Sequence, residues 1–251
     1  MRYIGGLATD IGSTRKVNQD AVILKKAAFD ENGALDLSSD EVRFALLAVC
    51  DGIGGLKYGE ISSGIVRKGI DEWCDSVLKW MDIRTVDSEM VFSHLKDAAD
   101  EWNCRVIDFA RDCNAPTGTT MSLLMLIKDG YFILQVGDSR IYRIREGVAE
   151  QLTIDASVVR YRDGKPKSYL NNFMGRDDEL KFTFSSGDLS AGDTFLVCSD
   201  GFYHRLKPED ILVFDKAGND QDIKLACKDL VAMMLERGET DNISIGALKI
   251  L

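Results

Sequence analysis

Several apolar runs in this chain meet an aspartate at one end, beside a glycine or another small polar residue. The aspartates in this arrangement are Asp51, Asp138, Asp200 and Asp241. An aspartate at the tip of a rigid strand is held in place, and a neighbouring glycine lets backbone carbonyls approach a ligand closely. If these tips converge, the fold places a cage of oxygen ligands at one end of its sheets. Each Asp-Gly pair taken alone is also compatible with an ordinary turn.

The chain alternates between strand-like and helix-like segments. Strand patterns occupy residues 4–11, 21–29, 42–49, 119–127, 131–136, 140–144, 148–152, 180–184, 194–197 and 243–250. Helical spacing of apolar residues marks 61–81, 95–113 and 221–236. Asp129-Gly130 and Glu146-Gly147 predict two-residue hairpin turns, because both turn positions require positive φ. This order indicates an α+β fold with antiparallel sheets covered by helices, and a less regular stretch at 156–178.

Length and charge exclude some classes of protein. The 251 residues, 45% of them hydrophobic, are enough for a sizeable core in one domain, with two small domains as the alternative. With a formal charge of −10, the chain lacks the excess of basic residues that would attract nucleic acid or an anionic membrane. No apolar run has the length of a signal peptide or a membrane span, so we expect a cytoplasmic protein. We also expect the protein to be a monomer.

The residue patterns of several common catalytic sites are absent from the sequence, which leaves carboxylates as the candidate catalytic groups. The only histidines, His94 and His204, cannot build a three-histidine zinc site. The six cysteines lack a C-x-x-C pair and most lie in apolar runs, so we interpret them as reduced core residues rather than disulfides or zinc ligands. No G-x-S-x-G elbow or phosphate-binding P-loop is present. Hard oxygen ligands select Mg²⁺ or Mn²⁺, and two such ions supply hydroxide at neutral pH by lowering the pKa of a shared water to about 7.

The motifs, taken in order, resemble the metal-dependent serine/threonine protein phosphatases of type 2C, in particular the bacterial single-domain members. The segments that carry the resemblance are 12–21, 49–55, 59–63, 118–120, 136–140, 198–201 and 240–243. The resemblance spans nearly the whole chain, from Thr9 to Ile250, and is strong only as an ordered series. It implies one domain over residues 1–251 with a four-layer α-β-β-α sandwich, in which helices flank two central antiparallel sheets.

The resemblance also implies a role for each site residue. The implied metal ligands are Asp51, the carbonyl of Gly52, Asp200 and Asp241 for two Mg²⁺ or Mn²⁺ ions, and Asp138 for a third, weaker ion. Arg15 is expected to grip the substrate phosphate, with a surface ion pair as the alternative, and Asp20 to order metal-bound water. For Asp138 the alternative is a turn-capping aspartate. His204, four residues after Asp200, is a further candidate for the general acid, with a surface helix position as the alternative.

The chain departs from the family pattern near the expected site. Ile53, Leu56 and Ala156 stand where relatives often carry histidine, and Gln19 stands where many have glutamate. The flap that bacterial relatives carry beside the active site is expected to be shortened, at about 156–174. Because loops set substrate choice more than scaffolds do, the substrate is harder to infer than the reaction.

We therefore expect an enzyme that hydrolyses phosphoserine and phosphothreonine in signalling proteins, opposing a serine/threonine kinase. Two alternatives stay open. One is a phosphatase-like module that binds phosphoproteins without turnover, favoured by the missing histidines and the altered flap. The other is a phosphatase of a small phosphorylated metabolite.

Overall fold

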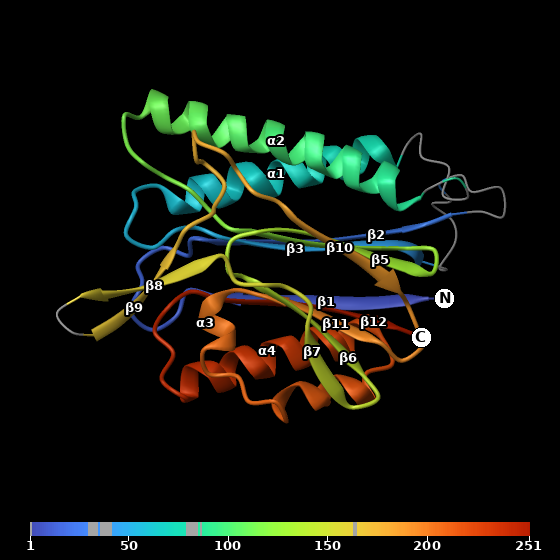
Figure 1. Cartoon of the computed structure of the whole chain (residues 1–251). Coiled ribbons are helices and arrows are strands. Elements are labelled where there is room, and N and C mark those ends of the chain that lie inside the picture. Colours follow the sequence, from blue (N-terminus) through green and yellow to red (C-terminus); the bar gives the residue numbers. More distant parts are fainter. Residues whose placement is uncertain (1, 30–34, 36–41, 79–84, 86, 163–164) are drawn as a thin grey trace.

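The protein is a sandwich of two antiparallel sheets between layers of helices (Figure 1). The computed structural model describes residues 2–29, 35, 42–78, 85, 87–162 and 165–251. The predicted α+β, four-layer α-β-β-α architecture is confirmed. No helix among the described residues is long and apolar enough to cross a membrane.

The first sheet has five strands in the order β10-β5-β4-β3-β2. Its strands are β2 (Asp20–Ala28), β3 (Val42–Asp51), β4 (Met121–Ile127), β5 (Gly130–Val136) and β10 (Thr183–Asp188). Two helices, α1 (Gly59–Val77) and α2 (Ser88–Asp112), cover its outer face (Figure 1). They lie close together because Gly69 of α1 has no Cβ, which would stand 2.4 Å from the Trp102 ring of α2.

The second sheet also has five strands, in the order β1-β12-β11-β6-β7. Its strands are β1 (Tyr3–Asp10), β6 (Arg140–Arg145), β7 (Val148–Gln151), β11 (Thr194–Cys198) and β12 (Ile243–Ile250). The short helix α3 (Asp200–Tyr203), the 3₁₀ helix η1 (Asp210–Lys216) and α4 (Asp220–Glu236) lie on its outer side (Figure 1). Asn219 caps α4 by accepting a hydrogen bond from the Asp222 amide at 3.0 Å.

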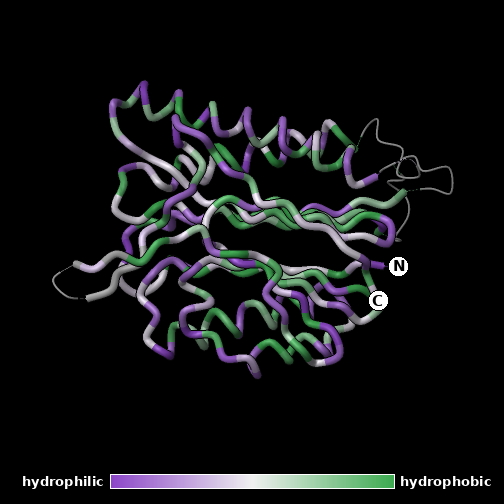
Figure 2. The backbone as a smooth tube through the Cα atoms, in the orientation of Figure 1, coloured by the Kyte–Doolittle hydropathy of each residue, from purple (hydrophilic) through white to green (hydrophobic). Residues whose placement is uncertain are grey.

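Three apolar cores separate the four layers. One core lies between α1, α2 and the first sheet and includes Trp102. A second lies between the sheets and includes Phe195, and a third lies under α4 and includes Phe202. Hydrophobic colour follows the strands of both sheets in Figure 2, whereas the helices alternate between hydrophobic and hydrophilic. The central strands read as continuous apolar runs because both of their faces are buried.

Antiparallel pairing brings one set of strand ends to the same edge of the sandwich. In the first sheet, β2 begins where β3 ends, with Asp20 opposite Asp51. In the second sheet, β12 begins where β1 and β11 end, with Ile243 opposite Asp10 and Ile245 opposite Cys198. The connection from β5 to β6 crosses between the sheets at this edge. The predicted convergence of aspartate-bearing tips therefore follows from the topology.

Three sequence expectations about secondary structure need correction. Ile127 pairs with Gly130, so the first hairpin turn is Lys128-Asp129 and Gly130 already belongs to β5. The stretch expected to be irregular contains a regular hairpin, β8 (Ser157–Arg162) and β9 (Lys165–Leu170). The strand expected at 180–184 starts later, because β10 pairs with β5 only from Thr183 onward. The end of the helix expected at 61–81 lies partly outside the described residues.

Candidate active site

A cleft of about 510 Å³ opens at the edge where the strand ends meet. The predicted site residues that line it are Arg15, Asp51, Gly52, Asp138, Asp200 and Asp241. They come from both sheets and from the loop after β1. The sequence prediction that these positions converge is therefore consistent with the geometry, although their chemical roles stay predictions.

Asp51 lines the cleft, and Asp20 is its neighbour on the adjacent strand. They are directly opposite each other in the β2–β3 ladder, so their side chains share one face of the sheet. Both Asp20 carboxylate oxygens are shielded from solvent and have no hydrogen-bond partner. The hydroxyls of Ser199 and Ser244 are near enough to lower the Asp20 pKa, but neither reaches hydrogen-bond geometry. The Asp20 carboxyl is thus buried beside a second carboxyl without a compensating donor of its own.

The backbone around Asp51 and Gly52 is fixed from several sides. The Asp51 amide donates to the Thr120 hydroxyl at 2.9 Å, and the Asp51 carbonyl accepts from the Thr120 amide at 2.8 Å. The Gly52 amide donates to the Gln19 carbonyl at 3.1 Å. A Cβ on Gly52 would stand 2.5 Å from the Gly59 carbonyl at the start of α1, so only glycine fits here. The strand end is held rigidly before any ligand binds.

Asp200 and Asp241 approach the cleft from the second sheet. Asp200 follows β11 and begins α3, and Asp241 lies two residues before β12. A Cβ on Gly201 would stand 2.1 Å from the Asn242 carbonyl, so this glycine lets the two segments touch. The motifs that contain Asp200 and Asp241 are far apart in the sequence, but they contact each other in the fold.

Arg15 lies in the cleft and is paired with Asp241. Its Nε donates to Asp241 Oδ1 at 2.7 Å and its Nη2 donates to Oδ2 at 2.6 Å, a bidentate geometry. The loop that carries Arg15 is tied to the same segment, because the Thr14 hydroxyl donates to the Thr240 carbonyl at 2.9 Å. Arg15 therefore forms an ion pair, which was the alternative interpretation of this residue. The ion pair lies in the cleft, and its partner is one of the expected metal ligands.

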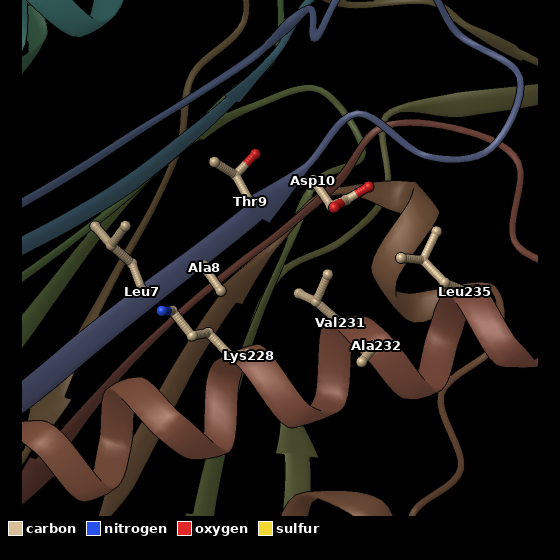
Figure 3. A pocket seen from close by; sticks show the side chains of 8 residues that line it. All are labelled: Leu7, Ala8, Thr9, Asp10, Lys228, Val231, Ala232 and Leu235. Carbon is tan, nitrogen blue, oxygen red and sulfur yellow. The ribbon is translucent and has the colours of Figure 1, made fainter.

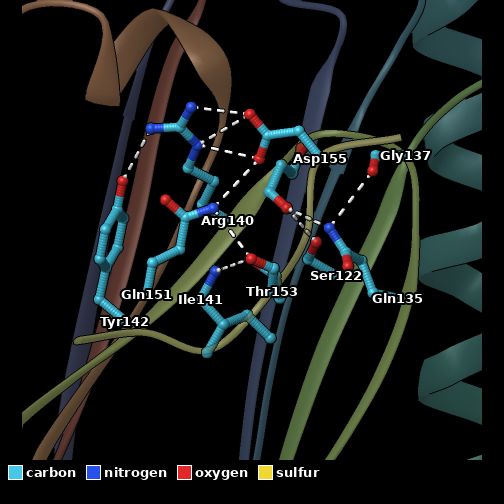
Figure 4. A network of polar contacts seen from close by, with 10 residues as sticks. Ser122, Gln135, Gly137, Arg140, Ile141, Tyr142, Gln151, Thr153 and Asp155 are labelled. Carbon is cyan, nitrogen blue, oxygen red and sulfur yellow. Dashed lines mark hydrogen bonds and ion pairs between the residues drawn. The ribbon is translucent and has the colours of Figure 1, made fainter. Parts of the chain in front are cut away.

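A buried polar network supports the turn that carries Asp138 (Figure 4). The Ser122 hydroxyl donates to the Ser139 carbonyl at 2.7 Å, and the Gln135 amide Nε2 donates to the same carbonyl at 3.1 Å. The Ser139 hydroxyl is 2.7 Å from that of Thr120, which also anchors Asp51. The positions of Asp138 and Asp51 are therefore mechanically linked.

Burial and mutual repulsion raise the pKa values of the cleft carboxyls. Burial is the larger cause for each, and neighbouring carboxylates add to it. The pKa rises to about 6 for Asp20 and to about 6 for Asp138. The pKa of Asp51 rises well above its usual value, and that of Asp200 rises too, although His204 opposes the shift. The site therefore favours a bound positive charge.

The donor set fits Mg²⁺ or Mn²⁺ rather than a softer metal. The cleft offers carboxylate and carbonyl oxygens, and the unpartnered oxygens of Asp20 belong to the residue opposite Asp51. Within the described ranges, no three His, Cys, Asp or Glu side chains already stand in a metal-coordinating arrangement. The residues that could hold ions are Asp51, the Gly52 carbonyl, Asp138, Asp200 and Asp241.

An adjoining hollow of about 530 Å³ shares Asp138 and Asp200 with the cleft and extends to His204. Arg140 lines it and donates from Nη2 to Asp155 Oδ2 at 2.7 Å (Figure 4). The Arg140 guanidinium also stacks over the Tyr203 ring, 3.7 Å from the ring centroid. His204 ends α3 with an exposed side chain. It lies on this side of the carboxylates, away from the residues that line the main cleft.

Part of the cleft lining, called the apolar wall from here on, is apolar or aromatic. It consists of Ile53, Leu56, Tyr169, Leu170 and Phe173. Two of these residues, Ile53 and Leu56, are the positions where relatives often have histidine. Tyr169 and Leu170 belong to the end of β9, so the β8–β9 hairpin contributes directly to the cleft.

A separate hollow between β1 and α4 has a different character (Figure 3). Its lining is largely Leu7, Ala8, Val231, Ala232 and Leu235, with charges only at Lys228 and Asp10. These lining residues do not bring several metal-binding side chains of one kind together. The acid-lined cleft is therefore the candidate active site.

Sequence reasoning did not assign roles to several residues that hold the site together. Asn242 accepts from the Gln19 amide at 2.9 Å and donates to the Ile11 carbonyl at 2.8 Å, so it joins the first and last motifs. Thr120 and Gln135 anchor two aspartate-bearing turns. The signal for Asn242 was present in the Asp-Asn motif, whereas a buried Gln135 in an apolar strand becomes informative only when its partners are known.

The sandwich with an acid-lined cleft at one edge is the architecture that the resemblance to type 2C phosphatases predicted. Residues 17–242 match the family described as Protein phosphatase 2C, and the chain belongs to this family.

Individual relatives agree with this assignment. The chain is 26% identical to protein phosphatase PhpP of Streptococcus pneumoniae, over 95% of this chain and 94% of that one. The serine/threonine phosphatase structure from S. agalactiae has a TM-score of 0.77 at 22% identity and covers 99% of this chain and 100% of its own. The catalytic domain of serine/threonine protein phosphatase PstP, solved with two manganese ions, has a TM-score of 0.74 at 22% identity over 98% and 97% of the two chains. At these identities the structural likeness shows the fold.

Proposed function

We propose that this protein hydrolyses phosphoserine and phosphothreonine in other proteins, with two Mg²⁺ or Mn²⁺ ions in the acid-lined cleft. The observation that carries the proposal is the convergence of Asp20, Asp51, Asp138, Asp200 and Asp241 from both sheets at one edge. Their raised pKa values are what a cation site produces when like charges are gathered in a buried place. The protein phosphatases among its relatives support the substrate class.

Asp51, the Gly52 carbonyl, Asp200 and Asp241 would hold the two ions, and Asp138 a third. When bound, the ions supply an activated water and stabilise charge on the phosphoryl group. Manganese in the related PstP structure supports this choice of metal. Asp20 is opposite Asp51 in the β2–β3 ladder, and its unpartnered carboxylate would accept hydrogen bonds from a water bound beside Asp51.

Arg15 would bind two phosphate oxygens of the substrate with the planar donor pair that now holds Asp241. Its guanidinium carries a raised pKa, first because of the hydrogen bond to Asp241, so it is charged at every relevant pH. The same two donors serve a carboxylate or a phosphate. Phosphate binding and release of Asp241 are therefore coupled in this proposal.

The proposed enzyme is a single domain over residues 1–251 that acts as a monomer in the cytoplasm and opposes a serine/threonine kinase. The flap is the β8–β9 hairpin, shorter than that of bacterial relatives. The apolar wall formed by Ile53 and Leu56 leaves the site without the histidines of other members. Proton supply to the leaving group then has to come from water or from a residue outside this wall.

The test is hydrolysis of p-nitrophenyl phosphate and of a phosphothreonine peptide by the purified protein, with Mn²⁺, Mg²⁺ or EDTA. We expect turnover of both substrates with either metal and none with EDTA. Turnover that EDTA does not affect would exclude the two-metal mechanism. Binding of the phosphopeptide without turnover would favour a regulatory binding module, and activity on small phosphate esters alone would favour a metabolite as substrate.

A further inference from the structure

The strand β1 lies at one edge of the second sheet, beside β12. Arg2 and Leu251 exchange two backbone hydrogen bonds at the start of this ladder, which fixes its hydrogen-bonding phase. In an antiparallel ladder, hydrogen-bonded pairs alternate with pairs whose amides and carbonyls point away from each other. The amide and carbonyl groups of Gly5, Leu7 and Thr9 therefore point toward the outer side of the sheet.

The protein closes this edge at Gly5 and leaves it open further along the strand. The Gly5 amide donates to Asp220 Oδ1 at 2.7 Å, and Asp220 at the start of α4 is also paired with Lys26 of β2. Within the described part of the chain, no other segment forms a hydrogen bond with the outward amides and carbonyls of Leu7 and Thr9. The open stretch thus presents alternating donors and acceptors at the spacing of a β-strand.

A hollow of about 430 Å³ lies along the open stretch, between β1 and α4 (Figure 3). Ala8 and Ala232 line it with short side chains, and Val231 and Leu235 line it with larger apolar ones. Ala8 belongs to the apolar core under α4, so it faces this helix. Directly opposite residues of an antiparallel ladder share one face. A residue paired with Ala8 from outside the sheet would therefore place its side chain in the hollow.

The two ends of the hollow carry opposite charges. Lys228 lies at the Leu7 end, and Asp10 lies at the Leu235 end (Figure 3). Lys228 is exposed, and it forms no ion pair within the described ranges. An extended chain with an acidic residue at one end and a basic residue at the other would complement both charges.

We propose that this edge binds an extended segment of a partner protein, which adds to the second sheet beside β1. The segment would run antiparallel to β1, since antiparallel pairs are slightly more stable per residue. From its N-terminus it would carry a basic residue opposite Asp10, an apolar residue opposite Ala8 and an acidic residue near Lys228. Backbone hydrogen bonds to Leu7 and Thr9 supply affinity, and the hollow selects the side chains.

Fluorescence anisotropy with a labelled peptide tests the proposal on the purified protein. The peptide carries lysine, valine and glutamate at alternate positions, with threonine between them. It should bind about tenfold more tightly than a scrambled peptide of the same composition, because only the ordered peptide fits the hollow and both charges together. Equal affinity for the two peptides would overturn the proposal.

Methylated peptides test the backbone contacts without any change in the protein. The threonines opposite Leu7 and Thr9 would direct their amides toward β1, whereas the valine opposite Ala8 would direct its amide away. Methylation of the threonine amides should weaken binding about tenfold, because a hydrogen bond is lost at each. Methylation of the valine amide is the matched control and should change affinity less. Equal losses would contradict strand addition.

A charge swap tests the position of the peptide. Lys228→Glu should weaken binding of the original peptide about two- to fivefold and should favour a peptide with lysine in place of glutamate. Lys216→Glu is the matched control, because Lys216 is exposed and lies outside the hollow. An unchanged preference in the Lys228 variant would overturn the assignment to this edge.

Two further measurements separate this proposal from other readings. None of the residues that line the hollow belongs to the acid-lined cleft, so the peptide should bind equally well in EDTA, whether or not the protein hydrolyses phosphate esters. Size-exclusion chromatography tests a second copy of the chain as the occupant. A monomer supports the proposal, whereas a dimer that the peptide dissociates would assign this edge to self-association and overturn it.

Discussion

The acid-lined cleft and the hollow between β1 and α4 differ in the charges that line them. The cleft gathers Asp51, Asp138, Asp200 and Asp241, and Asp20 is opposite Asp51 in the β2–β3 ladder. The hollow has only Lys228 and Asp10 as charged lining residues. The cleft therefore holds like charges together at a cost in stability and favours a ligand of opposite sign, whereas the hollow does not.

The two regions differ in how firmly the charges are held. The cleft carboxylates belong to strand ends fixed by buried hydrogen bonds through Thr120, Ser122 and Gln135. The hollow between β1 and α4 is lined mainly by small or apolar side chains, among them Ala8, Val231 and Ala232. Rigidly held, buried carboxylates suit chemistry that needs fixed geometry, whereas a mainly apolar lining offers few ligands for a cation or a phosphate.

The largest effect is expected from Asp51→Asn. It removes a carboxylate that lines the cleft and should lower kcat on p-nitrophenyl phosphate by about 100-fold or more, because an amide is a weak ligand for a divalent cation. The control is Asp188→Asn at the exposed end of β10, which should retain wild-type activity. Equal kcat for the Asp51 variant and wild type would show that the cleft does not carry the reaction.

A smaller effect is expected from Arg15→Lys. Lysine keeps the charge but loses the planar donor pair, so kcat/KM should fall by about 10- to 100-fold and inhibition by inorganic phosphate should weaken. Arg111→Lys is a matched control, since Arg111 also binds a carboxylate through its guanidinium, that of Asp177, on the exposed surface. Full activity of the Arg15 variant would assign this residue to a structural ion pair.

The charge strain in the cleft is tested by Asp138→Asn without metal. The folded-state pKa of Asp138 is about 6, above its ordinary 3.8, so ionisation disfavours the folded state. Wild-type stability in EDTA should therefore fall as pH rises from about 4 to about 7, and the asparagine variant should escape about 1–2 kcal/mol of this loss.

Denaturant-induced unfolding of the wild type and the Asp138→Asn variant at both pH values measures their free energies of unfolding and hence this difference. The burial and charge that raise this pKa come from the cleft, with Asp200 the largest electrostatic contributor. Excess Mn²⁺ should reverse the order of the two proteins, because the wild type then gains binding energy that the variant lacks. Equal pH dependence of the variant and wild type in EDTA would show that Asp138 is not strained.

The amino-acid sequence alone determined the order of the elements and the positions of the aspartates. Apolar alternation predicted the central strands because burial on one or both faces dictates it locally. The motifs around Asp51, Asp200 and Asp241 were readable because each follows or precedes such a strand. The second hairpin turn, Glu146-Gly147, was also predicted correctly, with positive φ at both residues.

Other features required the tertiary structure, because they depend on contacts between distant segments. The register that places Asp20 opposite Asp51, the pairing of Arg15 with Asp241 and the support of Asp138 by Gln135 are all non-local. The strands β8 and β9 escaped prediction because their sequences, SVVRYR and KPKSYL, lack the sustained apolar alternation of a half-buried strand. Only the pairing of these two strands with each other decides that the segment forms a hairpin, because backbone hydrogen bonds between strands carry no mark in the sequence.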